Sequence, residues 1–167
     1  MDISKAEIGF TYTFECIGLD GKVKWTDVQE NIIPDAGRDY IIGSSLMGVT
    51  QYADWYIGLY SAVRTPLAAD TMTTLMADAV EVLTYSGSVR LELIPDALSG
   101  GIFSNIGTPA EFTATATTTV NGGFITSSAA RGGTAGLLLS AVANTTPKIF
   151  SAGEILRVSA GLSFINV

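Results

Sequence analysis

This chain of 167 residues has the length of one domain. It carries nine basic and sixteen acidic side chains, for a net charge of -7, and charged residues make up only 15% of it, against about 25% in a typical soluble domain. It contains no His and one Cys. These counts exclude a His-based catalytic triad, a His-ligated metal site and a disulfide framework within the chain. Any acid–base chemistry would need Asp, Glu, Tyr or Lys.

The charge balance argues against nucleic acid as a partner, because affinity for a phosphate backbone comes mainly from Lys and Arg. Lys22 and Lys24 form the only close basic pair, and Asp20 and Asp27 flank them. The N-terminus lacks the basic and apolar regions of a signal peptide. The longest apolar runs, such as 135–142, are far shorter than the ~20 residues of a membrane span. We therefore expect a protein made in a cytoplasm, with neither nucleic acid nor membrane as a partner.

The first predicted element is a β-hairpin over residues 10–28. Its first strand alternates apolar and polar residues with period two, and the apolar positions are Phe10, Tyr12, Phe14 and Cys16. Asp20-Gly21 predicts a type I′ turn, in which both central residues take positive φ. The chain then returns through Val23 and Trp25. Because Cys16 lies on the apolar side of its strand, we expect a packed thiol rather than a reactive one.

Two helices are predicted on either side of a buried strand. Pro34-Asp35 favours a helix start, and this helix extends to about residue 47 before Gly48. Its expected buried stripe consists of Tyr40, Ile41, Leu46 and Met47. The aromatic run 55–60 predicts a strand that is buried on both faces. A short helix follows over 70–78, with Asp70 or Thr71 as its cap.

The second half of the chain has the pattern of strands. Paired strands are predicted at 81–85 and 88–93, and a Thr-rich strand at 112–120 leads into an Asn121-Gly122 hairpin turn and a strand at 124–126. The last predicted strands are 137–142 and 156–164. The sequence therefore predicts a mainly β protein, an antiparallel β-sandwich or jelly roll with one or two short helices. We expect one domain over 1–167, with 1–7 as a possible N-terminal arm.

Candidate sites for chemistry each have a plainer structural interpretation. Asp35 and Asp39, and likewise Glu92 and Asp96, have the four-residue spacing of carboxylates on one helix face, as an acid–base pair of a glycan hydrolase could have. Solvated surface is the favoured interpretation of both pairs. Glycine clusters at 99–101 and 131–133 lack the residues of a phosphate loop and predict turns. Trp25, Trp55 and the tyrosines could form a sugar-binding platform, but their strand positions favour the core. We expect no enzymatic activity, no cofactor and no metal site.

One apolar segment has the composition of a turn. Ile102, Phe103 and Ile106 lie between Gly101 and Gly107. Apolar residues on a loop either fold back onto the domain or contact a partner. The low charge of the chain, together with its mean hydropathy of +0.38, favours a partner. We therefore expect these three residues to lie in a protein interface.

Short motifs along nearly the whole chain after residue 10 resemble a family of small structural proteins of tailed-bacteriophage virions. These motifs are Gly-Lys-Val-Lys-Trp at 21–25, Trp-Tyr-Ile-Gly-Leu at 55–59, Ala-Ala-Asp-Thr-Met at 68–72, Phe-Thr-Ala at 112–114, Gly-Gly-Phe-Ile-Thr-Ser-Ser at 122–128, Gly-Gly-Thr-Ala-Gly at 132–136 and Gly-Glu-Ile-Leu-Arg-Val at 153–158. They consist of turn glycines and core aromatics, and no catalytic residues come with the resemblance.

The resemblance implies a capsid decoration or cement protein that binds the major capsid protein on the outer surface of the head. It further implies a virion location after synthesis in the host cytoplasm, and copies that associate as a homodimer or homotrimer. The alternative is a structural protein of the tail or an appendage, with Trp55 or the tyrosines contacting the host surface.

Overall fold

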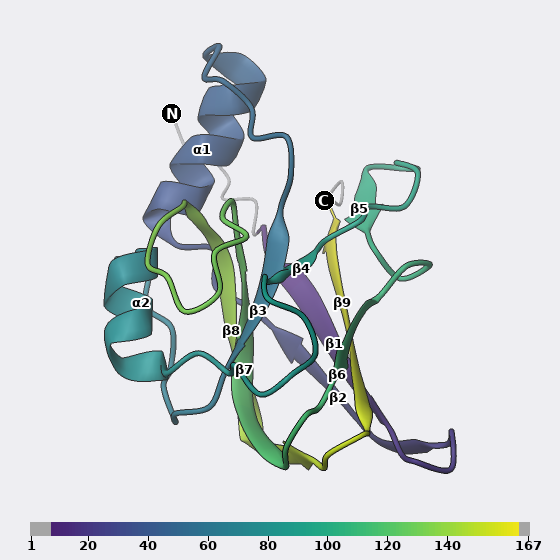
Figure 1. Cartoon of the computed structure of the whole chain (residues 1–167). Coiled ribbons are helices and arrows are strands. Elements are labelled where there is room, and N and C mark those ends of the chain that lie inside the picture. The colour runs from purple at the N-terminus through teal and green to yellow at the C-terminus, as the bar shows by residue number, and fades with distance from the viewer. Residues whose placement is uncertain (1–7, 164–167) are drawn as a thin grey trace.

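Two antiparallel β-sheets pack face to face and enclose the main apolar core of the protein (Figure 1). The structure is a computed structural model and describes residues 8–163. The predicted arm at 1–7 lies outside the described residues. Within them the chain forms nine strands and two helices, so the predicted mainly β fold with short helices is confirmed as a β-sandwich.

The first sheet has the order β2-β1-β9-β5, with β6 also paired to β9, and consists of β1 (Phe10–Ile17), β2 (Val23–Glu30), β5 (Ile102–Ser104), β6 (Ala110–Thr113) and β9 (Ile155–Ser163). β5 and β6 share one side of β9, because β1 occupies the other. Asn105 fills the interval between them. Its Oδ1 accepts from the Ala160 N–H at 2.7 Å, and its Nδ2 donates to the Val158 carbonyl at 3.3 Å. This buried side chain therefore continues the ladder across the break.

The second sheet has the order β4-β3-β7-β8 and consists of β3 (Tyr56–Tyr60), β4 (Leu91–Glu92), β7 (Thr118–Thr126) and β8 (Leu138–Phe150). Its inner face meets the first sheet. Helix α2 (Met72–Ala79) packs on the other face, where Met72 and Leu75 join a second apolar cluster with residues of β3, β7 and β8. This sheet is therefore buried on both faces, as the aromatic run at 55–60 predicted for β3.

The predicted N-terminal hairpin is confirmed, but its turn differs from the prediction. β1 and β2 pair antiparallel from Thr11–Glu30 to Ile17–Val23. Of the two central turn residues only Gly21 has a positive φ, at 76°, so the type I′ assignment is wrong. The Asp20 carboxylate instead accepts from the Lys22 N–H at 3.1 Å, and the loop is closed by the Gly18 N–H donating to the Lys22 carbonyl at 2.8 Å. Cys16 is fully buried, as expected.

Both helices form where they were predicted, but the buried stripe of the first is partly wrong. α1 (Asp35–Leu46) turns Tyr40 and Ile41 toward the core, whereas Leu46 and Met47 are 82% and 75% exposed. The helix approaches β8 through Gly37, where a Cβ would overlap the Leu139 carbonyl. Thr71 caps α2 by accepting from the Thr74 N–H in a capping box.

Three strand predictions in the second half are wrong. Segments 81–85 and 88–93 do not pair with each other; Leu91 and Glu92 pair with β3, and only Glu81 and Tyr85 of the remaining residues form isolated bridges. The Thr-rich run 112–120 is not one strand, because the chain leaves the first sheet after Thr113 and joins the second at Thr118. A strand of either sheet shows the same period-two alternation, so the sequence pattern does not indicate where the chain passes from the first sheet to the second. The final strand is confirmed as β9, and the strand at 137–142 continues to Phe150.

The predicted turn at Asn121-Gly122 is also wrong, since both residues lie inside β7. Two of the directly opposite residue pairs on β3 and β7 consist of a glycine and an aromatic residue. They are Gly58–Phe124 and Tyr60–Gly122. A Cβ on Gly58 would overlap the Phe124 ring, and one on Gly122 would overlap Tyr60. These glycines therefore provide close approach for the rings and do not form a turn.

We expect Gly58→Ala to lower the free energy of unfolding by about 1–3 kcal/mol or more, because the added methyl group displaces the Phe124 ring from a filled core. Gly161→Ala on β9 is the matched control. Its Cβ would meet only ordinary contacts, with the Phe103 carbonyl at 3.6 Å and the Ser104 Cβ at 3.7 Å. Urea denaturation of the two variants measures the difference, and equal losses would contradict the close-approach role of Gly58.

Candidate interaction surface

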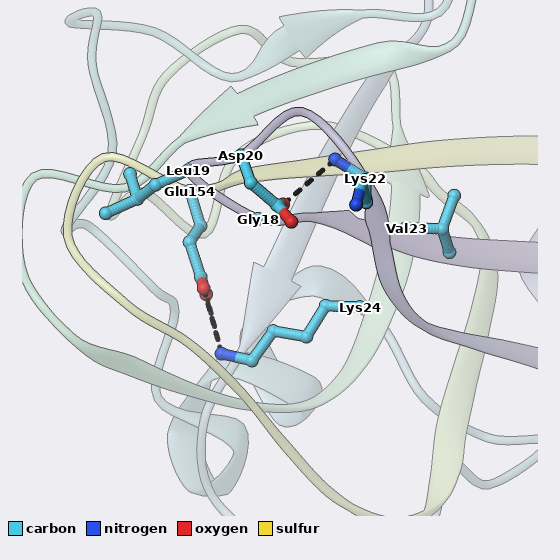
Figure 2. Close-up of a pocket in the computed structure, with 7 residues that line it drawn as sticks. All are labelled: Gly18, Leu19, Asp20, Lys22, Val23, Lys24 and Glu154. Atoms are coloured by element: carbon cyan, nitrogen blue, oxygen red, sulfur yellow. Dashed lines mark hydrogen bonds and ion pairs between the residues drawn. The ribbon is translucent and has the colours of Figure 1, made fainter.

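A half-open pocket at the tip of the β1–β2 hairpin contains an ion pair that holds the hairpin to the turn before β9 (Figure 2). The Glu154 carboxylate accepts from the Ser151 N–H at 2.6 Å and from Lys24 Nζ at 2.9 Å. These donors hold the pKa of Glu154 below its ordinary value. The pKa of the Cys16 thiol is raised to about 11, mainly by burial and secondly by the nearby Glu154 carboxylate. The polar groups of this pocket are therefore engaged in structural contacts.

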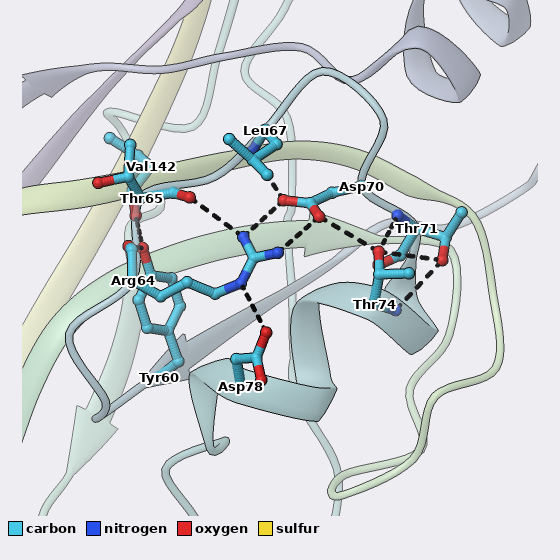
Figure 3. A network of polar contacts seen from close by, with 9 residues as sticks. All are labelled: Tyr60, Arg64, Thr65, Leu67, Asp70, Thr71, Thr74, Asp78 and Val142. Atoms are coloured by element: carbon cyan, nitrogen blue, oxygen red, sulfur yellow. Dashed lines mark hydrogen bonds and ion pairs between the residues drawn. The ribbon is translucent and has the colours of Figure 1, made fainter.

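A second ion pair fixes the segment between β3 and α2 (Figure 3). Arg64 donates to both oxygens of Asp70 at 2.6 Å, and the Leu67 N–H donates to the same carboxylate at 2.7 Å. Burial alone would raise the pKa of Asp70, but the guanidinium and the Leu67 amide outweigh it and lower that pKa. The Tyr60 hydroxyl donates to the Val142 carbonyl at 2.7 Å and lies 3.1 Å from the Arg64 carbonyl, which shares the same proton, so it connects the segment to β8.

A third pair, Arg90–Glu81, is almost completely buried. Arg90 donates to both Glu81 oxygens at 2.9 and 2.8 Å and lies 5.2 Å from the centre of the Phe124 ring. It also donates to the Ser128 and Gly133 carbonyls at 3.0 and 2.6 Å, so it holds the loop between β7 and β8 against the outer face of the second sheet. Turns at both predicted glycine clusters are confirmed, and this loop contains one of them.

In each of the two carboxylate pairs that sequence spacing singled out, one member has its own partner and the other is exposed. Asp35 forms an exposed ion pair with Arg38, and Asp39 is exposed on the same helix. Glu92 is exposed on β4, whereas Asp96 accepts from the Ser104 hydroxyl at 2.9 Å and from the Gly107 N–H at 3.1 Å. Within residues 8–163 no three Cys, Asp or Glu side chains are grouped as metal ligands. In the same range no helix is long and apolar enough to cross a membrane.

An apolar cleft of about 160 Å³ opens at the end of the sandwich where β1 begins and β9 ends. One wall comes from the C-terminal half of α1 and the other from β5. The lining residues are Phe10, Tyr40, Ile41, Ser44, Ser45, Trp55, Leu93, Phe103, Ile125, Leu139 and Leu162. Trp55 therefore packs at the core, in a cluster with Tyr40 and Tyr52 whose ring centres lie 5.2–5.6 Å apart.

Among residues 8–163, four segments that build this end of the molecule contain no charged residue. They are 8–14, 40–53, 97–110 and 158–163, and we call the surface that they form the uncharged end. Figure 1 shows that α1 extends beyond the sheets here and that the loops around β5 lie at the same end. Its exposed apolar side chains are Ile8, Ile42, Leu46, Met47, Val49, Tyr52, Leu98, Ile102 and Ile106. An apolar surface without interspersed charge is typical of a protein interface.

The three predicted interface residues lie at this end but do not all face outward. Ile102 and Ile106 are 53% and 71% exposed. Phe103 turns inward, with its ring edge-on to Phe10 at 6.2 Å, because the segment expected as a loop contains the strand β5. The bonds from Ser104 and Gly107 to Asp96 fix the loop that presents Ile106.

Sequence reasoning missed the contribution of α1 to this surface. Leu46 and Met47 were expected to be buried, and Ile42 was not singled out. The uncharged stretch 40–53 is the signal that could have found them, because it has more apolar residues than one buried side of the last helical turns can hold.

The folded protein should lose stability in acid. The pKa values of Asp70, Asp96 and Glu154 are lowered in the folded state, so their stabilising contribution is present above the unfolded carboxyl pKa of about 4 and is lost as the pH falls through the folded values. The chain has no His, the side chain that ordinarily titrates between about pH 5 and 8. We expect the free energy of unfolding to be nearly constant from about pH 6 to 8 and to fall below about pH 4.

Urea denaturation at a series of pH values measures this dependence. Asp70→Asn should make the acid-side slope shallower, whereas the matched control Asp39→Asn, at an exposed position on α1, should leave it unchanged. The same slope in both variants would contradict the role of the Arg64–Asp70 pair.

The chain matches no model of a known protein family and none of the curated proteins with which it was compared. The resemblance to virion proteins therefore stands on the sequence motifs alone.

Proposed function

We propose that the protein is a structural component of tailed-bacteriophage virions, and that it decorates the outside of the head by binding the major capsid protein. The observation that carries the proposal is the uncharged end, an apolar surface to which the described segments contribute no charged residue although the chain has a net charge of -7. The resemblance described above supports the same function.

The fold suits a protein that clamps its neighbours. A sandwich whose second sheet is buried on both faces is stiff, so little conformational entropy is lost when it docks. A protein that binds the assembled shell but not its dissociated subunits stabilises that shell by mass action. The acidic surface would also keep the protein away from the packaged genome.

Attachment to the tail or to an appendage is the second candidate. The cluster of Tyr40, Tyr52 and Trp55 favours it, because aromatic side chains that lie partly exposed at one end of a stiff domain are suited to contact with a host surface. Tail-only particles that retain the protein would support this candidate over the first.

Binding to purified heads tests the proposal. Heads that lack the protein should take up many dozens of copies each, measured by co-sedimentation and densitometry against the major capsid protein. We expect Ile106→Glu to reduce uptake at a fixed concentration, because it places a charge in an apolar contact. Val63→Glu, at an exposed position in the loop between β3 and α2, is the matched control and should bind normally. Uptake of only a handful of copies would contradict a decoration role.

A further inference from the structure

We propose that Asp96 is a positioning residue for docking to the capsid, because its carboxylate holds the loop between β5 and β6 in the conformation that presents Ile106. We call this segment the Ile106 loop. The inference rests on the proposed function, in which Ile106 contacts the major capsid protein, and it names the side chain that prepares that contact before the partner binds.

The Ile106 loop has an anchor on each side of Ile106. Asn105 is buried and binds β9, where its Oδ1 accepts from the Ala160 N–H at 2.7 Å. On the other side the Gly107 N–H donates to the Asp96 carboxylate, with its nitrogen 3.1 Å from one oxygen and 3.2 Å from the other. Ile106 itself is 71% exposed. The loop therefore holds one apolar side chain out into solvent while both of its neighbours are fixed.

Asp96 reaches the loop from a different part of the chain. It follows β4, and its bond to Gly107 spans eleven positions of the sequence. Its carboxylate also accepts from the Ser104 hydroxyl at 2.9 Å, and its own N–H donates to the Ser104 carbonyl at 2.7 Å. Asp96 therefore connects the end of β5 to the far side of the Ile106 loop.

The residue at position 107 fits this contact. A Cβ on Gly107 would lie 2.7 Å from Asp96 Oδ1, which is closer than non-bonded atoms approach. Glycine is the residue type that allows such a close approach to the backbone. Any larger residue would displace the carboxylate from the loop.

The titration of Asp96 is governed by the groups that donate to it. The Gly107 amide and the Ser104 hydroxyl hold the pKa of Asp96 below its ordinary value. Residues 97–110 and 158–163, which form β5, the Ile106 loop and the adjoining part of β9, contain no titratable side chain. Glu92, on β4, is the nearest charged residue along the chain and is exposed. The carboxylate is therefore ionised at neutral pH and accepts strong, charge-assisted bonds.

A loop that is fixed before docking binds more tightly, because the entropy of ordering it is not lost on association. The cost of ordering the backbone of one residue corresponds to about a tenfold change in an equilibrium constant. Without the Asp96 anchor, Gly107 would have to be ordered when Ile106 docks. Of the two anchors only Asp96 titrates, since the amide of Asn105 has no ionisable group.

Binding to purified heads that lack the protein tests the inference, with co-sedimentation over a series of concentrations. We expect Asp96→Ala and Gly107→Ala to raise the apparent dissociation constant about tenfold, because each disrupts the bond between these two residues. Asp96→Asn keeps one acceptor oxygen and should bind with an intermediate affinity. Glu92→Ala is the matched control, because it removes the same charge from an exposed position on β4, and it should bind as the wild type does.

Nuclear magnetic resonance of the free protein gives a second measurement that a general loss of stability would not mimic. The chemical shift of the Gly107 amide proton should follow the protonation of Asp96, with a midpoint below the ordinary Asp pKa of about 3.9. Because the pKa is lowered, the anchor is present above that midpoint and is lost as the pH falls through it. Asp96→Asn should abolish the shift, and wild-type head binding should weaken relative to Asp96→Asn over the same pH range.

Equal head binding by Asp96→Ala and Glu92→Ala would overturn the inference and leave the proposed function intact. A Gly107 amide proton that does not respond to the protonation of Asp96 would also overturn it. A wild-type protein that fails to bind heads would contradict the proposed function and this inference together.

Discussion

The architecture depends on the close approach of β3 and β7, where two glycines lie opposite two aromatic rings. Phe124 covers Gly58, and Tyr60 covers Gly122. Both rings belong to the apolar cluster against which α2 packs, and Arg90, which binds the loop between β7 and β8, lies over the Phe124 ring. The second sheet therefore has apolar contacts on both sides.

Three ion pairs hold connections of the chain in place. Arg90 connects Glu81 to the β7–β8 loop, and Arg64 binds Asp70 just before the start of α2. Glu154 binds Lys24 and so connects the hairpin to the turn before β9. Arg90–Glu81 and Arg64–Asp70 are largely buried, and such pairs stabilise a fold only when their remaining bonds are satisfied, as the surrounding carbonyls and amides do here. In the third pair Lys24 is partly exposed, and Glu154 also accepts from the Ser151 N–H.

The uncharged end is the apolar feature of the surface on which the proposed function rests. α1 and the β5 region carry exposed aliphatic side chains there, and an apolar cleft lies between them. The proposed function rests on this end of the molecule, and the Ile106 loop is the part of it that the proposal assigns to contact with the capsid.

The sequence by itself determined the β class, the first hairpin, both helices, the buried third strand and the last strand, because these elements have clear periodicity, capping residues or a turn dipeptide. It also indicated the apolar segment at 102–106. Only the tertiary structure decided that Gly122 serves close approach, that the Thr-rich run crosses between sheets, and that Leu46 lies outside while Phe103 lies inside. Each of these depends on what lies opposite a residue in a distant segment. Local sequence patterns show which side chains are apolar, but the packing of distant strands determines which of them are buried.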